Sequence, residues 1–255
     1  MLWRLSHSSS IRRYLHDDET CSIVLYDQDS EALCSGLCGR LLSCGFDLIL
    51  IAMNPSQQSS LHEHLRSAYP KRSIAFTTAR AVDGDNALQT FSAGSQNISL
   101  FISCIRAGSK AGHEFSTKEA PSIQTVADLQ KAALPLLVNH APSALVIIAN
   151  TLSSSLEEGS GYFKSFAAGL SEQLQSHGHK ETEVTFMEYL DAESRAKTPS
   201  LLCPSPEVLS DSILRALGCN STHVIPYWPH ELLSWLIWCL MFILPSSFVL
   251  KFMPS

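Results

Sequence analysis

Apolar residues follow two alternating patterns along the chain. Short and nearly continuous apolar runs, at 22–26 and 47–53, are typical of strands that are covered on both faces of a parallel sheet. Between these runs, residues 30–44 repeat apolar side chains every 3.6 positions or so, which predicts a helix with Gly45 as its C-cap. A strand, a crossover helix and a parallel strand form the first unit of a doubly wound fold.

The same alternation continues as far as residue 190. It predicts further strands at 72–78, 97–105, 144–150 and 183–190, and helices at 57–68, 83–93, 125–139 and 162–175. We expect Pro135 to kink the third of these helices or end it early, and we expect Ser205 and Pro206 to cap and start a helix that runs to Gly218. The sequence therefore predicts an α/β protein with one Rossmann-like, doubly wound parallel sheet.

Residues 232–244 form a different kind of segment, because Ser234 is the only polar residue among them. Pro245 and two serines interrupt the segment, but no charge occurs from Leu232 to Leu250, and the neighbouring tryptophans suit the headgroup region of a bilayer. We predict a C-terminal apolar helical segment that binds membrane lipid, either across the bilayer or at its surface. The alternative is a helix that docks on the core or closes a substrate pocket.

The N-terminal residues carry Arg4, Arg12 and Arg13 and no acid as far as Leu15, a composition typical of a mitochondrial presequence. The alternative is a disordered N-terminal arm. Together these patterns divide the chain into an arm at 1–20, an α/β domain at 21–230 and a membrane-associated segment at 231–255.

Composition limits the classes of partner. The net charge is −6 and basic clusters are scarce, which argues against nucleic acid. Charged residues make up only 16% of the 255 residues, which indicates a membrane surface or a large apolar interior. The eight cysteines and ten histidines show no metal-ligand spacing, so no metal is expected, although Cys34 and Cys38 can meet one helical turn apart.

The turn after the first strand lacks the chemistry of a dinucleotide site. Such a site needs glycines where the backbone approaches the pyrophosphate, and bare amides at the start of the next helix. Residues 27–34 contain no glycine and carry three acids, Asp27, Asp29 and Glu31. This turn therefore either never held a nucleotide or has lost the ability.

The order of elements and several short segments resemble the short-chain dehydrogenase/reductase superfamily. Within it, the chain is similar to the branch of 17-beta-hydroxysteroid dehydrogenases and very-long-chain 3-oxoacyl-CoA reductases, which includes inactive hydroxysteroid dehydrogenase-like proteins. The resemblance covers residues 21–253. It rests on GFDLILIAMN at 45–54, ALPLL at 133–137, PSPEV at 204–208, ALG at 216–218 and PYWPH at 226–230, none of which is a catalytic motif.

The resemblance implies where a cofactor would be held. The family's three cofactor glycines fall on Gln28, Ala32 and Cys34, and the basic residue that selects NADPH falls on Met53. The Asn-Asn-x-Gly motif after the fourth strand falls on residues 103–106, where the chain has Ser-Cys-Ile-Arg. All these positions are degenerate, which implies that no dinucleotide cofactor is bound.

The resemblance also implies the positions of the catalytic residues. The family's catalytic Ser falls on Thr151, which keeps a hydroxyl, whereas the Tyr and Lys fall on Leu156 and Ser160. Tyr162 and Lys164 lie nearby, but they are two positions apart in the sequence, and residues at this spacing lie about 200° apart around a helix axis. Thr151, Tyr162 and Lys164 are therefore the only candidate catalytic residues if the protein is active.

Three hypotheses follow for function. The first is a non-catalytic, membrane-associated protein of the endoplasmic reticulum that binds lipid or a protein partner, with the mitochondrion as the alternative location. The second is an active NADPH-dependent oxidoreductase of steroid or 3-oxoacyl-CoA substrates with an atypical site. The third is a subunit that forms a homodimer, or a heterodimer with an active relative, through the helices at 125–139 and 162–175, which join subunits in the family.

Overall fold

Parallel strands form the centre of the molecule, as the apolar runs predict. The computed structural model describes residues 10–16, 20–26, 31–52, 60–78, 97–105, 123–150, 156–189, 200–201 and 203–243. Its strands form one seven-stranded sheet in the order β3-β2-β1-β4-β5-β6-β7, and each neighbouring pair is parallel. The strands are β1 (Thr20–Tyr26), β2 (Asp47–Ala52), β3 (Ile74–Thr78), β4 (Asn97–Ile105), β5 (Ser143–Asn150), β6 (Thr182–Tyr189) and β7 (His223–Val224).

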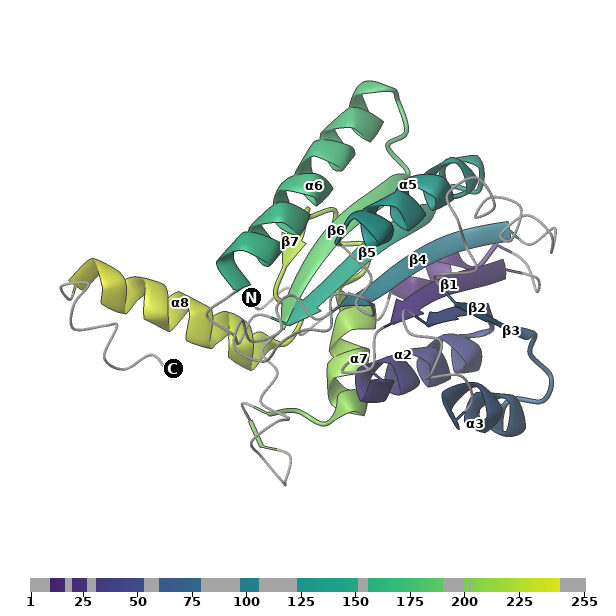
Figure 1. Ribbon diagram of the computed structural model, residues 1–255. Coiled ribbons are helices and arrows are strands. Elements are labelled where there is room, and N and C mark those ends of the chain that lie inside the picture. Colours follow the sequence, from purple (N-terminus) through teal and green to yellow (C-terminus); the bar gives the residue numbers. More distant parts are fainter. Residues whose placement is uncertain are drawn as a thin grey trace.

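Helices cover both faces of the sheet (Figure 1). On one face lie α5 (Ile123–Asn139) and α6 (Leu156–Ser176), and on the other lie α2 (Glu31–Cys44), α3 (Ser60–Ala68) and α7 (Pro206–Ala216). The last helix, α8 (Trp228–Ile243), extends away from this body. The predicted doubly wound parallel sheet is confirmed.

Alternation of side chains along the strands divides the core in two. Val24 of β1 packs in the layer of α2 and α7, whereas its neighbours Ile23 and Leu25 pack in the layer of α5 and α6. Successive side chains of a strand point to opposite faces, so a strand buried on both faces has no polar alternation to show. For this reason each of these strands corresponds to a nearly continuous apolar run in the sequence.

The crossing of α2 and α7 is close because Gly36 lies at the contact. A Cβ atom at Gly36 would come within 2.5 Å of the Ser210 hydroxyl oxygen and 3.2 Å of the Pro206 carbonyl oxygen. Beside this crossing, the Arg40 guanidinium lies 2.7 Å from the Asp211 carboxylate. The predicted N-cap is confirmed, since the Ser205 side chain accepts a hydrogen bond from the backbone N–H of Val208.

A short 3₁₀ turn, η1 (Ser10–Tyr14), packs against the sheet domain ahead of β1. Tyr14 is fully buried and donates a hydrogen bond to the Glu183 carboxylate, which lies 2.9 Å from the Arg13 guanidinium. The same carboxylate accepts a hydrogen bond of 2.9 Å from the backbone N–H of Gly218. Residues 10–16 thus belong to the packed part of the chain, although they lie in the segment whose composition indicated a presequence or a disordered arm.

Several boundaries differ from the prediction. Helix α5 continues through Pro135 to Asn139, because Ala133 and Leu137 on either side of the proline are buried against the sheet. Helix α6 begins at Leu156, six residues before its predicted start, and α8 begins four residues early at Trp228. Strand β7 was not predicted, since two residues carry no periodic pattern. The helix expected at 83–93 lies outside the described residues.

Candidate dinucleotide site at the carboxyl edge of the sheet

The sheet has one point at which a ligand crevice is expected. The strand order reverses between β1 and β4, and open α/β sheets bind ligands outside the carboxyl ends of the strands at such a point. The two strands end at Tyr26 and Ile105. The segments that follow them, 27–30 and 106–122, lie outside the described residues. The described part of the site is therefore its floor, and the start of α2.

Two buried cysteine side chains lie in the first turns of α2. Cys34 is fully buried, and its Sγ atom lies 3.6 Å from the Sγ atom of Cys38, so the expected meeting of the two thiols is confirmed. Ala32 lies exposed on the same helix. Where the family has a third glycine, the absence of a side chain allows a helix to approach the strand closely. The resemblance implies that Cys34 stands at that position in this chain. Gln28 and Met53 lie outside the described residues.

Tyr162 and Lys164 are both exposed on α6, one before and one after a buried residue. Phe163 between them is buried against the sheet, whereas Tyr162 is 41% exposed and Lys164 is also exposed. The Tyr162 ring stacks on Phe166, with ring centroids 6.2 Å apart. Residues i and i+2 of an α-helix are about 200° apart around its axis. The structure therefore does not bring the Tyr162 phenol and the Lys164 ammonium to one point. Thr151 lies outside the described residues, and so do the side chains of Leu156 and Ser160.

The chain's fold can be compared with known structures. It is similar to a short-chain dehydrogenase from Sphingobium yanoikuyae in complex with NADPH, with a TM-score of 0.61 and 16% identity over 89% of this chain and 97% of that one. It is also similar to the apo structure of a short-chain oxidoreductase from Pseudomonas aeruginosa with an atypical catalytic centre, with a TM-score of 0.60 and 14% identity over 80% of this chain and 95% of that one. The fold is that of the short-chain dehydrogenases/reductases. The resemblance inferred from the sequence is confirmed at this level.

Sequence comparison finds a distant similarity to an enzyme whose name matches the branch that the sequence resembles. No protein-family model matches the chain. A very-long-chain 3-oxoacyl-CoA reductase from Aspergillus terreus is 20% identical over 224 residues, which cover 78% of this chain. The chain spans 64% of the length of that relative. At this identity, the comparison supports the short-chain dehydrogenase/reductase fold and leaves the activity to be proposed.

Sequence reasoning missed a buried polar pair beneath the crevice of this short-chain dehydrogenase/reductase fold. Gln130 of α5 is fully buried and donates a hydrogen bond of 2.8 Å to the hydroxyl of Ser103 on β4. Its side-chain oxygen accepts no hydrogen bond within the described residues. Ser103 begins the stretch on which the family's Asn-Asn-x-Gly motif falls. The helical spacing of Gln130 from Val126, Ala133 and Leu137, all buried, could have revealed that it faces the sheet.

Two further properties of the described residues bear on the site. No group of three or more His, Cys, Asp or Glu side chains there could hold a metal ion. Across the same residues, no helix combines the length and the hydropathy that a bilayer crossing requires. Helix α8, with 16 residues, is the described part of the apolar C-terminal segment.

Proposed function

We propose that this protein is a non-catalytic member of the short-chain dehydrogenase/reductase fold that acts by binding at a membrane surface through α8. The observation that carries the proposal is the exposed apolar side of α8. Trp228, Leu232, Trp235 and Leu236 are exposed, and their spacing places them on one side of the helix. Single exposed apolar residues are ordinary, but a contiguous row marks a surface that binds a membrane or a partner.

The first turn of α8 docks on the body, and the rest does not. Pro229 and His230 are buried, and the His230 ring meets the Tyr227 ring edge-on at 4.8 Å. From Leu232 onward the described side chains are exposed or half-buried. The sequence then continues to Leu250 without a charge. A helix of this kind can lie in the interface with its apolar side in the bilayer. The docked first turn fits the alternative of a helix that docks on the core, whereas the exposed side chains from Leu232 onward favour a contact with a membrane over docking on the core or closure of a pocket.

Two features of the candidate site support the loss of hydride transfer. The resemblance puts a cofactor glycine at the position of Cys34, a side chain that is buried here, and Tyr162 and Lys164, two residues apart on α6, point in different directions. In this fold's enzymes the lysine must lie beside the phenol to lower its pKa, a role that needs both groups at one point. We therefore propose that no dinucleotide cofactor is bound. From the family resemblance and the apolar C-terminal segment, we propose that the membrane is that of the endoplasmic reticulum, with the mitochondrion as the alternative.

Cofactor binding tests the non-catalytic part. We expect no change in the melting temperature of the full chain with NADPH or NADH at millimolar concentration. A ligand at 100 times its dissociation constant would stabilise the native state by about 2.7 kcal/mol, which a thermal shift detects easily. A clear shift, or reduction of a 3-oxoacyl-CoA or a 17-ketosteroid that Thr151→Ala or Tyr162→Phe abolishes, would overturn this part.

Vesicle flotation tests the membrane part. We expect the full chain to float with phosphatidylcholine vesicles, and Trp235→Glu with Leu236→Glu to abolish flotation. Leu201→Glu with Val208→Glu is the matched control, because Leu201 and Trp235 are 62% and 60% exposed, and Val208 and Leu236 are both 48% exposed. If the control variant loses as much binding as the α8 variant, α8 is not the membrane contact.

An active NADPH-dependent oxidoreductase of steroid or 3-oxoacyl-CoA substrates is the second candidate. The complete parallel sheet favours it, as do similar structures whose complexes contain NADPH or NADP. Thr151, Tyr162 and Lys164 would then provide the catalytic groups. The similarity to a protein with an atypical catalytic centre is consistent with this candidate. The cofactor experiment above separates it from our proposal.

Assembly with a second chain is compatible with either candidate. The outer side of α6 carries the small residues Ser165, Ala168 and Gly169, and a Cβ atom at Gly169 would meet nothing within 4 Å. Small side chains let a second helix approach closely. We propose a homodimer, or a heterodimer with an active relative, through this side. Light scattering of the purified chain, with Ala168→Glu as the disrupting variant, tests the homodimer.

A further inference from the structure

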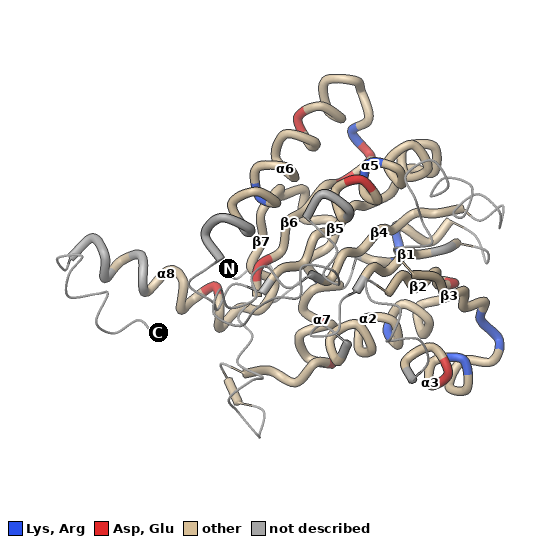
Figure 2. Tube along the Cα trace, in the orientation of Figure 1, with Lys and Arg blue, Asp and Glu red and all other residues tan. Residues whose placement is uncertain are grey.

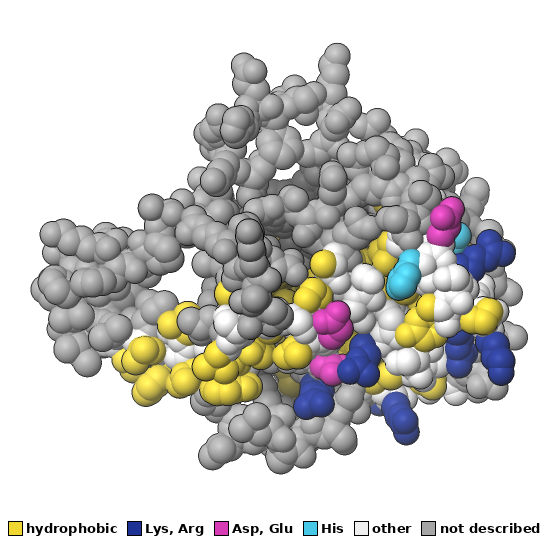
Figure 3. All heavy atoms as spheres, turned by 90° about the horizontal axis from the view of Figure 1, so that it is seen from below, with side chains coloured by type: hydrophobic (Ala, Val, Ile, Leu, Met, Phe, Trp, Pro, Cys, Tyr) yellow, Lys and Arg dark blue, Asp and Glu magenta, His cyan; other side chains and the backbone are white. Residues whose placement is uncertain are grey.

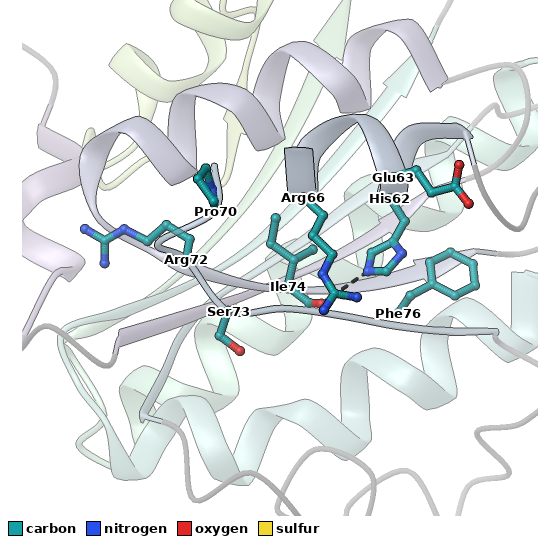
Figure 4. Close-up of a pocket in the computed structure, with 8 residues that line it drawn as sticks. All are labelled: His62, Glu63, Arg66, Pro70, Arg72, Ser73, Ile74 and Phe76. Atoms are coloured by element: carbon teal, nitrogen blue, oxygen red, sulfur yellow. Dashed lines mark hydrogen bonds between the residues drawn. The ribbon is translucent and has the colours of Figure 1, made fainter. Parts of the chain in front are cut away.

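A groove between α3 and β3 lies at the edge of the sheet, away from the crevice between β1 and β4 (Figure 4). It has a volume of about 910 Å³, and Arg66, Arg72, His62 and Ser73 are among its lining residues. None of these residues belongs to the candidate dinucleotide site. The proposed function does not use them either.

Positive charge is concentrated along this groove. Residues 60–78 carry Arg66, Lys71 and Arg72 against the single acid Glu63, in a chain whose net charge is −6. Figure 2 shows these basic residues on α3 and the turn that leads to β3. No ion pair joins the three to any described residue, whereas Arg13 and Arg40 each pair with a carboxylate. The three cations are therefore available for an anionic ligand.

Hydrogen bonds fix the backbone that presents these cations. His62 of α3 lies with its Nε2 atom 3.2 Å from the carbonyl oxygen of Ile74, and its ring centroid lies 5.8 Å from that of Phe76. The Asp47 carboxylate accepts a hydrogen bond of 3.0 Å from the backbone N–H of Ser73, the residue after Arg72. The turn is thus held at both the helix and the strand. An anion that binds there meets a preformed surface.

The arginines point to separate parts of the groove. In Figure 4 the Arg66 side chain extends toward His62 and Ile74, while the Arg72 side chain extends to the opposite end. They do not converge on one small anion. Separate cations on one surface fit an array of phosphate groups, as an anionic bilayer presents.

We propose that the α3–β3 groove contacts the phosphate groups of an anionic lipid bilayer into which α8 inserts its apolar side. The inference rests on the proposed membrane function and names the class of lipid. Figure 3 shows one face of the molecule, with a group of hydrophobic side chains toward one end and several Lys and Arg side chains toward the other end, where further hydrophobic side chains and an acidic one lie among them. The uncharged sequence from Leu232 to Leu250 and the basic segment 60–78 then have complementary roles, insertion and orientation.

Vesicle composition tests the inference. Full-length protein is floated with phosphatidylcholine vesicles that either contain or lack phosphatidylserine. Each basic residue near an anionic surface strengthens binding about fivefold, so Arg66→Glu with Arg72→Glu should weaken binding to the anionic vesicles at least about 25-fold. Binding of this variant to the neutral vesicles should stay unchanged. Arg12→Glu with Lys180→Glu is the control, because it makes the same change in net charge at two exposed positions, before β1 and after α6.

The outcomes separate this inference from the proposed function. If the α3–β3 variant binds anionic vesicles as the wild type does, or if the control loses equally, the groove is not the contact, although α8 can still bind the membrane. If wild type fails to bind any vesicle, the proposed function itself fails. Inorganic phosphate that competes better than chloride at equal ionic strength would show a discrete phosphate site and overturn the bilayer as its ligand. Circular dichroism verifies that each variant is folded.

Discussion

Helices α7 and α8 are neighbours in sequence with similar beginnings and different surroundings. Each has a proline in its first turn, Pro206 in α7 and Pro229 in α8. In α7 the apolar residues Leu209, Ile213 and Leu214 are buried, and α7 packs against α2. In α8 the described side chains from Leu232 to Leu236 are exposed or half-buried, and none of the other described elements makes an extended contact with this helix.

The difference shows that apolar content does not predict burial. Helix α7 alternates apolar and charged residues, so one side of it needs a protein surface and the other needs water. Helix α8 is apolar on nearly every side, and among its described side chains the buried ones lie in the first turn. A helix that is apolar all around must be surrounded by apolar matter. The described part of the chain does not provide these apolar surroundings, and we therefore propose that a bilayer provides them.

Truncation of one apolar side chain in each helix gives the largest expected contrast. Ile213→Ala should lower the free energy of unfolding by about 2–5 kcal/mol, because Ile213 is fully buried and the change leaves a cavity. Leu236→Ala should change it by less than about 0.5 kcal/mol, since that side chain is already exposed. Urea unfolding measures both. A large loss for Leu236→Ala would mean that α8 packs on the body.

The second contrast concerns how the end of α7 is held. Gly218, just after α7, shares the Glu183 carboxylate with Tyr14 and Arg13. Tyr14→Phe should lower the free energy of unfolding by about 1.5–3 kcal/mol, the range for a buried hydrogen bond to a charged group. Tyr162→Phe is the control, because its ring is exposed, and it should have an effect below about 0.5 kcal/mol. Equal effects of the two variants would contradict the buried anchor.

The same anchor predicts alkaline behaviour. Burial, and then the negative charge of Glu183, raise the pKa of Tyr14 well above its ordinary value. A raised pKa means that folding favours the neutral phenol, so this contribution is complete below about pH 10 and is lost as the pH rises above it. Tyrosinate absorbance of the wild type should therefore include a contribution from Tyr14 that appears only when the protein unfolds. The Tyr14→Phe variant should lack this late contribution, which would assign it to Tyr14.

Much of this fold follows from sequence pattern, for a reason visible in α2 and β4. Both have strong periodic signals, and their observed bounds match the predicted ones within a residue. The η1 turn and β7 could not be predicted, because five and two residues show no period. Tyr14 is buried by a partner 169 residues away, Glu183, and only the tertiary structure brings the two together.

The candidate site was less predictable than the fold. The contact of Cys34 with Cys38 followed from helical spacing alone, and the separation of Tyr162 from Lys164 followed from the same geometry. Gln130 was missed, because a polar residue on a buried helix side contradicts the simple apolar pattern. Thr151, Gln28 and Met53 lie outside the described residues, so their roles stay predictions.

Glycine substitutions sharpen the contrast between a crowded helix and a free one. At Gly36 a new methyl group would displace the Ser210 hydroxyl and press on the Pro206 carbonyl, so Gly36→Ala should cost about 1–2 kcal/mol even after the gain in helix propensity. At Gly169 the same change meets nothing within 4 Å and should stabilise the protein by about 0.5–1 kcal/mol. Thermal unfolding compares the two. Stabilisation by both variants would mean that α2 and α7 are not in close contact.

The smallest expected effect lies at the start of α7. Ser205→Ala removes the N-cap and should lower the free energy of unfolding by about 1 kcal/mol near pH 7. The Ser205 hydroxyl also donates a hydrogen bond that lowers the pKa of Glu207. A lowered carboxyl pKa stabilises the fold above the ordinary pKa of Glu, and this stabilisation is lost as the pH falls through the folded-state pKa.

The cost of Ser205→Ala should therefore shrink between pH 7 and pH 3, because the wild type loses the Glu207 interaction in acid and the variant lacks it throughout. Urea unfolding at the two pH values measures the change. Glu207→Gln is the control, since it keeps the cap and removes the titrating group, and its own cost should vanish in acid. If Ser205→Ala costs the same at both pH values, the cap acts through the backbone N–H of Val208 alone. The start of α7 would then be held by a neutral hydrogen bond, without help from the charge on its first turn.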